Sequence, residues 1–249
     1  MAVVNTIIAT VDHDEIARFD NLAKQWWDSD GPMRALHRLN PVRLAYIRDR
    51  ICWHFGSDPL TTKPLAGLRV LDMGCGAGLL SEPLRRLGAD VVGVDAASEV
   101  IDVARHHAET VELDIDYRQI TAEELADAGE RFDAVVAMEI LEHVSDTGAF
   151  VNALGRMLPP QGILVAATLN RTLKSFALAI VGAEWILGWL PRGTHQWDKF
   201  LRPSEVAREL RGAGFDVGDV TGVSFDATTG GWHTSTDTGV NYLLFATKP

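Results

Sequence analysis

From Arg69 onward, short apolar runs alternate with amphipathic stretches along the chain. The apolar runs have the length of strands, and the stretches between them carry apolar residues at helical spacing. This alternation is typical of βαβ units, in which helices connect parallel strands. It predicts strands over 69–73, 90–95, 116–119, 133–138 and 163–168, and helices over 79–87, 98–109 and 147–158.

The end of the chain follows a different pattern. A helix is predicted from Pro203-Ser204 to Gly212 or Gly214, and the two apolar runs after it, 215–220 and 241–247, have no helical pattern between them. Because parallel neighbours need a crossover, we expect these two runs to pair antiparallel at one edge of the sheet. A dinucleotide dehydrogenase usually ends its sheet with another parallel crossover, so this ending argues against that class.

The first part of the chain carries helical spacing of its own. Apolar residues recur through 16–26 and again through 44–51, with turn signals at Gly31-Pro32 and Asn40-Pro41 between them. Residues 56–67 have the composition of a linker. We therefore expect one domain over 1–249, with a helical N-terminal cap over 12–65, a ligand-binding core over 66–170, an apolar insertion over 171–200, and a C-terminal helix with edge strands over 201–249.

Composition and charge narrow the class of protein. A length of 249 residues suits one α/β domain. The 34 acidic and 23 basic residues give a formal charge of −11, whereas binding to a phosphate backbone needs clustered Lys and Arg, so we expect no nucleic acid partner. Cys52 and Cys75 are too few for a disulfide framework, and residues 1–10 lack the zones of a signal peptide, which together predict a reducing cytoplasm.

The most apolar stretch, 176–190, is shorter than the roughly 20 residues that cross a bilayer. Two interpretations of it remain open. It could be a buried helix or a lid over an active site. Alternatively, segment 171–192 could lie on an anionic membrane surface, because basic residues flank the stretch and tryptophans occur within it, namely Arg171, Lys174, Arg192, Trp185 and Trp189.

The strongest local motif joins the first predicted strand of the sheet to the next helix. It reads Val70-Leu71-Asp72-Met73-Gly74-Cys75-Gly76-Ala77-Gly78, and glycines let such a turn approach a ligand closely. The glycines follow G-x-G-x-G with an acid two residues earlier, and Leu79 stands where a dinucleotide fingerprint has its third glycine. The motif therefore predicts a nucleotide-type site other than a dinucleotide site, with Asp72, Gly74, Gly76 and Gly78 as its residues.

Asp95 ends the second predicted strand, at the sheet edge where the glycine turn begins. A carboxylate there can accept hydrogen bonds from both hydroxyls of an adenosine ribose. We therefore predict that Asp95 binds a ribose. The alternative is that Asp95 only caps the helix beginning at Ser98.

A third motif, Met138-Glu139-Ile140-Leu141-Glu142-His143, follows the fourth predicted strand. It therefore lies at the carboxyl edge of the sheet, where open α/β proteins bind ligands. If the run is helical, Glu139, Glu142 and His143 project from one face and could hold a divalent cation or activate a hydroxyl, with His143 as the general base. The alternative is that these side chains only support the turn.

Longer stretches of the chain, from about Val11 to Tyr242, carry a resemblance to one family. They are Trp26-Trp27-Asp28, residues 36–44, the glycine turn, Met138 to Val144, Thr168-Leu169-Asn170-Arg171, residues 181–184, Gly193-Thr194-His195 and Asn241-Tyr242. In these stretches the sequence resembles the bacterial ubiquinone biosynthesis O-methyltransferases, which are class I S-adenosylmethionine (SAM)-dependent methyltransferases. The tryptophan pair, the N-P-x-R segment and the Gly-Thr-His turn are shared by few other families.

The resemblance implies an α/β, Rossmann-like fold of the class I methyltransferases. This fold has a mostly parallel seven-stranded sheet with an antiparallel C-terminal edge, helices on both faces and a helical N-terminal cap. SAM is the implied cofactor, with Gly74, Asp95 and Met138 among its contacts and Arg43 at its methionyl carboxylate. Met73 and Ala77 depart from the Val and Gly that relatives often carry, and neither change removes a ligand.

The resemblance also implies a metal ion and a class of substrate. In related eukaryotic members the residues equivalent to Glu139, Glu142 and His143 are taken as magnesium ligands, so Mg²⁺ is a candidate second cofactor. The implied activity is O-methylation of polyprenylated phenols and quinols, namely 2-polyprenyl-6-hydroxyphenol and 3-demethylubiquinol. The alternatives are an O- or C-methyltransferase for another small hydrophobic acceptor, and a catalytically weak SAM-binding member of a membrane-associated assembly.

The implied location follows from the substrate. We expect a cytoplasmic protein that lies peripherally at the inner face of the membrane, because the prenyl tail keeps the substrate there. Its expected partners are the polyprenylated substrate, anionic lipids in contact with segment 171–192, and an assembly of ubiquinone-biosynthesis proteins.

Overall fold

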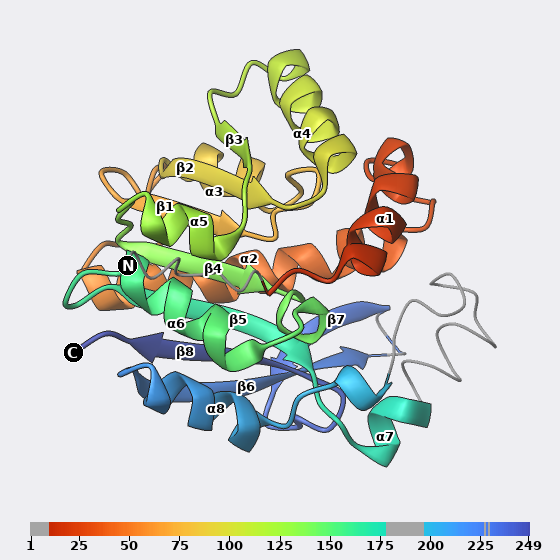
Figure 1. The fold of residues 1–249 in the computed structure, drawn as a ribbon, viewed down its shortest axis with the longest axis vertical. Coiled ribbons are helices and arrows are strands. Elements are labelled where there is room, and N and C mark those ends of the chain that lie inside the picture. Colours follow the sequence, from red (N-terminus) through yellow and green to blue (C-terminus); the bar gives the residue numbers. More distant parts are fainter. Residues whose placement is uncertain (1–9, 178–196, 227, 229) are drawn as a thin grey trace, which may run out of the picture.

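Eight strands form one mixed sheet in the computed structural model, which describes residues 10–177, 197–226, 228 and 230–249 (Figure 1). The sheet runs in the order β3-β2-β1-β4-β5-β8-β6-β7. Its strands are β1 (Arg69–Met73), β2 (Asp90–Asp95), β3 (Asp116–Gln119), β4 (Ala134–Met138), β5 (Ile163–Leu169), β6 (Asp216–Asp226), β7 (Gly231–Ser235) and β8 (Asn241–Thr247).

The strand order places a crevice at β1. Strands β1 to β5 are all parallel, and β1 pairs with β2 on one side and β4 on the other. Chain connections therefore leave β1 in opposite directions, which opens a crevice at the carboxyl ends of β1 and β4. The second half of the sheet is antiparallel, because β8 inserts between β5 and β6.

Helices cover both faces of the sheet (Figure 1). Side chains alternate along the buried strands, so Val135 and Ala137 join one apolar core while Ala134 and Val136 join the other. The helices are α1 (His13–Leu22), α2 (Arg34–Phe55), α3 (Ser81–Arg86), α4 (Ser98–Thr110), α5 (Ala122–Asp127), α6 (Thr147–Met157), α7 (Leu173–Ser175) and α8 (Pro203–Gly212), with short 3-10 turns at η1 (Ala23–Gln25), η2 (Leu141–His143) and η4 (Trp197–Lys199).

The prediction of a turn at Asn40-Pro41 was wrong, because α2 continues through Pro41. A proline inside a helix removes a hydrogen bond and costs about 3 kcal/mol. Tertiary contacts offset this cost, since Leu39, Ile47 and other α2 residues are buried and the Asn40 amide donates to the Leu79 carbonyl at 2.7 Å. The other turn signal, Gly31-Pro32, does precede the start of α2.

The predicted strands and the antiparallel pairing of the last two runs are confirmed, with two additions. The sheet has eight strands rather than seven, because the stretch after residue 220 extends β6 and returns as β7. Neither segment has the apolar run of a buried strand, so the apolar pattern does not mark them. Helix α5 is also new; it has only six residues and begins with a capping box between Thr121 and Glu124.

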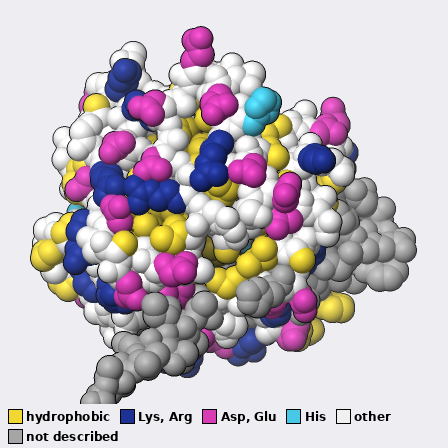
Figure 2. All heavy atoms as spheres, turned by 45° about the horizontal axis from the view of Figure 1, so that its top comes forward, with side chains coloured by type: hydrophobic (Ala, Val, Ile, Leu, Met, Phe, Trp, Pro, Cys, Tyr) yellow, Lys and Arg dark blue, Asp and Glu magenta, His cyan; other side chains and the backbone are white. Residues whose placement is uncertain are grey.

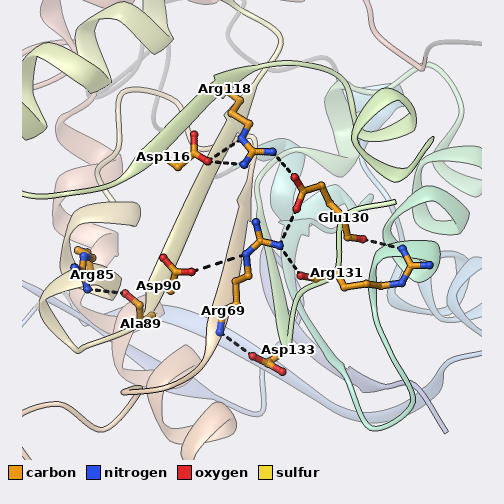
Figure 3. A network of polar contacts seen from close by, with 9 residues as sticks. All are labelled: Arg69, Arg85, Ala89, Asp90, Asp116, Arg118, Glu130, Arg131 and Asp133. Atoms are coloured by element: carbon orange, nitrogen blue, oxygen red, sulfur yellow. Dashed lines mark hydrogen bonds and ion pairs between the residues drawn. The ribbon is translucent and has the colours of Figure 1, made fainter. Parts of the chain in front are cut away.

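Ion pairs connect the amino-terminal ends of the strands (Figure 3). Arg69 in β1 and Arg118 in β3 each donate to Glu130 at 2.7 Å, and the backbone N–H of Arg69 donates to Asp133 at 2.8 Å. The two arginines hold the pKa of Glu130 below its usual value, the contact with Arg118 contributing most. This network therefore ties β1, β3 and the turn before β4 together at the edge opposite the crevice.

Charges of both signs are interspersed over the face drawn in Figure 2, with apolar side chains visible between them. Among the described residues, no helix combines the length and apolarity needed to cross a bilayer. Residues 178–196 lie outside the described part of the chain, and they include most of the predicted membrane-contact segment 171–192.

Candidate active site

A cavity of about 730 Å³ opens at the carboxyl edge of the sheet, a volume within the range of small-molecule sites. The glycine turn and Asp95 line one end of it, and Trp26, among other cap residues, lines a second wall. Residues of the antiparallel strands, such as Val223 and Asn241, line the far end. One cavity thus extends from the crevice beside β1 to the antiparallel half of the sheet.

The glycine turn is held against β2 and closely covered. The backbone N–H groups of Gly74 and Cys75 donate to the Val94 carbonyl at 2.7 and 3.0 Å. Gly74 and Gly76 have φ values of 74° and 53°, in the left-handed region that favours glycine. A Cβ at Gly76 would lie 2.3 Å from the Trp26 ring, and one at Gly78 would lie 2.2 Å from the Tyr117 hydroxyl oxygen. The turn therefore accepts no side chains at these positions.

Asp72 connects the two elements on either side of this turn. It is the second-to-last residue of β1, is 2% exposed, and accepts a hydrogen bond from the Ser81 hydroxyl at the start of α3, at 2.5 Å. Burial raises the pKa of Asp72 to about 6, against the opposing effects of the Ser81 hydrogen bond and the Arg43 charge. Asp72 therefore joins the two elements that flank the glycine turn.

Asp95 faces the glycine turn rather than capping a helix. One carboxylate oxygen accepts from the Gly76 N–H and the other from the Ala97 N–H, both at 3.0 Å. Ala97, not Asp95, is the N-cap residue of α4. Each carboxylate oxygen can accept a second hydrogen bond, so Asp95 can still bind a ligand in the cavity that it lines.

The third motif, 138–143, does not form a continuous helix. The prediction that its side chains share one face required such a helix. Glu139 adopts φ of 48°, in the left-handed region, and only Leu141–His143 form a 3-10 turn. The three candidate side chains consequently turn to different partners. Glu139 pairs with Arg43, Glu142 accepts from the Thr168 hydroxyl at 2.7 Å, and Nδ1 of His143 lies 3.2 Å from a carboxylate oxygen of Glu15.

This arrangement does not fit a divalent cation. Magnesium needs several oxygen ligands that converge on one point. Glu139, Glu142 and His143 do not converge, and within the described ranges no group of three or more His, Cys, Asp or Glu side chains could hold a metal ion. No step of the reaction proposed below therefore passes through a metal.

His143 lies in a pocket made by the cap. The ring packs edge-on against Phe19, with centroids 5.3 Å apart, and Arg18 and Lys199 contact the Glu15 carboxylate beside it. The contact with His143 contributes most to holding the pKa of Glu15 below its usual value, and burial opposes it. Helix α1 therefore places a carboxylate beside an imidazole at the cavity wall, without a hydrogen bond between Glu15 Oε2 and His143 Nδ1.

Arg43 and Met138, both expected at the donor, also line the cavity. Arg43 is 5% exposed on α2, and its Nε is buried without a hydrogen bond from the described residues. Met138 is the last residue of β4 and is 8% exposed. The fold thus brings all the residues predicted for donor binding to one end of one cavity, apart from Gly78, which lies behind the turn against Tyr117.

Two site residues were missed by the sequence analysis. Glu123 is 8% exposed in the cavity wall; one of its oxygens accepts from the Thr10 hydroxyl at 2.7 Å, and the other has no hydrogen bond within the described residues. Its position just after β3 is a signal that the rule used for Asp95 could have found. Glu15 gives no such signal, because it is far from His143 in the sequence.

Solved structures share this fold. The magnesium protoporphyrin IX methyltransferase of Synechocystis PCC 6803, crystallised with SAH, matches 94% of each chain at 21% identity with a TM-score of 0.61. A SAM-dependent methyltransferase of Thermotoga maritima, described as a possible histamine N-methyltransferase, covers 94% of this chain and 99% of its own at 18% identity, with the same TM-score. Residues 33–220 match the family model of a methyltransferase domain. The protein is therefore a Rossmann-like, class I SAM-dependent methyltransferase, and the predicted fold class is confirmed.

Closer relatives narrow the class to one family. A ubiquinone biosynthesis O-methyltransferase of Azorhizobium caulinodans is 57% identical over 96% of this chain and 94% of its own length. Another, from Methylobacterium sp. (strain 4-46), is 55% identical over 96% of both chains. The chain belongs to the ubiquinone biosynthesis O-methyltransferase family, as the sequence motifs predicted.

Proposed function

We propose that this chain transfers a methyl group from SAM to a phenolic oxygen of a polyprenylated catechol or quinol in ubiquinone biosynthesis. The observation that carries the proposal is the placement of His143, with the Glu15 carboxylate beside it, in the same cavity as the glycine turn and Asp95. High identity to the family over nearly the whole chain supports the substrate class.

The donor end of the cavity offers a partner for each polar part of SAM. Asp95 would accept from the ribose hydroxyls, and the buried free oxygen of Glu123 would accept from the adenine amino group. Arg43 would hold the methionyl carboxylate, for which Glu139 now stands in as the anionic partner. Bound SAM supplies an electrophilic methyl group on a sulfonium.

At the acceptor end of the cavity, the substrate hydroxyl must be oriented toward the methyl group and must lose its proton. His143 would take the proton of the attacking hydroxyl while the oxygen–carbon bond forms and the carbon–sulfur bond breaks, and the proton would then leave from the imidazole to water. Glu15, whose carboxylate lies 3.2 Å from Nδ1 of His143, would stabilise the charge that the ring gains. Glu142, tied to Thr168 in β5, positions the turn that carries His143.

The test is turnover by the full chain. With SAM and a short-chain catechol, the protein should release S-adenosylhomocysteine (SAH), and His143→Ala should lower kcat by about 10²- to 10⁴-fold, the usual contribution of a general base. His106→Ala is the matched control, because His106 is exposed on α4 away from the cavity. A wild-type protein that releases SAH with other acceptors but not with catechols would favour the broader alternative. Activity lost on chelation and restored by Mg²⁺ would return Glu139, Glu142 and His143 to a metal site.

We further propose that the enzyme collects its substrate at the membrane. The apolar segment 176–190 with its basic flanks supports this proposal, as do the side chains of Leu173 and Phe176 at its start, which are 82% and 43% exposed. A prenyl tail would keep the substrate in the bilayer, and an assembly of enzymes of the same pathway would shorten its route.

A further inference from the structure

Trp27 connects the cap to two elements of the sheet domain without lining the cavity. It follows η1 and is half-buried. Its indole Nε1 donates to the Ala77 carbonyl of the glycine turn at 3.0 Å. Its ring stacks on the imidazole of His107 in α4, with centroids 3.5 Å apart and 7° between the planes. One side chain therefore ties the cap both to the glycine turn and to α4, the helix that follows Asp95.

The imidazole on which Trp27 stacks is itself held in place by a buried acid. His107 Nδ1 pairs with Oε1 of Glu82, which is 1% exposed and lies in the first turn of α3. The other oxygen of Glu82 accepts from Arg86, one helical turn further along α3, at 3.1 Å. An imidazole fixed between a carboxylate and an indole has little freedom to rotate, so it offers Trp27 a preorganised surface.

Other contacts dock the same part of the cap around the donor end. Helix α1 and η1 pack against α4 (Figure 1), and the Asp20 carboxylate of α1 accepts from the Glu99 N–H in the first turn of α4 at 2.9 Å. Trp26 lies so close over the glycine turn that a Cβ at Gly76 would be 2.3 Å from its ring. The cap thus reaches both sides of the donor end, and Trp27 contacts both.

The donor end is complete only while the cap is closed. Arg43 and Trp26 line it from the cap, whereas the glycine turn and Asp95 line it from the sheet. A ligand that contacts both parts binds the closed molecule, so its apparent dissociation constant rises in proportion as the closed fraction falls. A contact that holds the cap on the glycine turn therefore affects the affinity for the donor even where it does not touch the donor.

We propose that Trp27 is a positioning residue for SAM, which holds the cap closed over the donor end through the Ala77 hydrogen bond and the stack on His107. The proposal depends on SAM binding and not on the identity of the acceptor. It applies equally to SAH, which has the same adenosyl and amino-acid groups. The kcat at saturating SAM is not affected, because bound donor restores the closed state.

The experiment measures the affinity of the full chain for SAH by calorimetry. Trp27→Ala removes the hydrogen bond and the stack and should weaken binding by about 10- to 30-fold, whereas Trp27→Phe keeps a ring on His107 and should weaken it by about 3- to 10-fold. With SAM and a short-chain catechol, KM for SAM should rise in parallel while kcat stays within about twofold. In ligand-free Trp27→Ala, amides of residues 14–26 should exchange with deuterium faster than in wild type.

Two controls separate positioning from stability. Arg69→Ala breaks the ion pairs at the opposite edge of the sheet, so it should lower the melting temperature and leave the SAH affinity within about twofold. Trp53→Ala removes a tryptophan that is 71% exposed on α2, and it should change neither quantity.

Other outcomes would overturn the inference. A lower melting temperature of Trp27→Ala with unchanged SAH affinity would show that Trp27 only stabilises the fold. A lower kcat at saturating SAM with an unchanged KM would place its role in the chemical step instead. Should Trp27→Ala not fold, Trp27→Phe carries the same comparison. If wild type turns over no catechol, the proposed acceptor is wrong, and the SAH affinities still decide the role of Trp27.

Discussion

Single buried carboxylates define the chemistry around the cavity. Asp72, Glu123 and Glu142 are each more than nine-tenths buried, and each is tied to a hydroxyl, from Ser81, Thr10 and Thr168 respectively. A neutral hydroxyl compensates only part of the cost of burying a charge, so burial raises the pKa of Asp72 and Glu142. The buried charges of these side chains therefore lower the free energy of unfolding at neutral pH rather than raise it.

Asp72 gives a pH signature that can be measured. Its pKa is about 6 in the folded protein and 3.8 ordinarily, so the folded protein binds this proton more tightly and the free energy of unfolding falls as pH rises through that range. The free energy of unfolding of wild type relative to Asp72→Asn should fall by about 1 kcal/mol between pH 5 and pH 7, measured by urea denaturation. Asp90→Asn, at an exposed site, is the control. A difference that does not change with pH would contradict the assignment.

Among the elements, α1 and η1 form a wall of the site although they precede the sheet by more than forty residues. The Thr10 hydroxyl contacts Glu123, Val11 forms an isolated bridge with Val144, and Lys199 donates to Asp12 at 3.0 Å. Trp26 lies over Gly76. Ala23 and Trp26 also join a small apolar cluster with Ala97 and Val100. Because this cluster is separate from the two cores of the sheet, the wall is expected to open more easily than the sheet.

Ligand binding should therefore protect this wall. With saturating SAH, backbone amides of residues 14–26 should exchange with deuterium more slowly, because opening of the wall then requires loss of the ligand. Helix α8 is the internal control, since none of its residues lines the cavity. Equal changes in α1 and α8 would indicate only global stabilisation, and an unchanged α1 would mean that the wall does not close on the donor.

At the scale of the whole molecule, the two halves of the sheet contribute different residues to the cavity. The parallel half, from β3 to β4, carries the glycine turn, Asp95 and Met138, and the antiparallel half, from β8 to β7, carries Asn241 and apolar residues of the same cavity. Every described strand belongs to this one sheet, and the single domain over 1–249 stays a prediction. The segment proposed to contact the membrane, 171–192, begins after β5, and the structure describes it as far as residue 177.

Membrane contact should depend on that segment alone. Wild type should float with vesicles rich in anionic lipid, and a Trp185→Ala and Trp189→Ala double substitution should reduce the bound fraction several-fold, because both rings are proposed to lie at the interface. Trp53→Ala is the control, since Trp53 is 71% exposed on α2 outside the segment. Equal flotation of wild type and the double variant would refute the proposal.

The sequence by itself determined the elements and the donor end of the site. Apolar runs and glycine spacing are local, and the carboxyl-edge rule places the residues after each parallel strand together without coordinates. Asp72, Gly74, Gly76 and Asp95 could be found for this reason, whereas Met138 was implied only by the family resemblance. The runs of β1, β2, β4 and β5 could also be found, because these strands are buried on both faces and must be apolar.

Only the tertiary structure decided which side chains face one another. Glu15 meets His143, and Arg43 meets Glu139, across more than ninety residues, and no local pattern encodes either pair. Glu139 has a left-handed backbone conformation, so residues 138–143 do not form the helix that the predicted metal site required. Pro41 stays in a helix because packing outweighs propensity. Such pairings arise when distant elements pack together, so they depend on the whole fold rather than on any one segment.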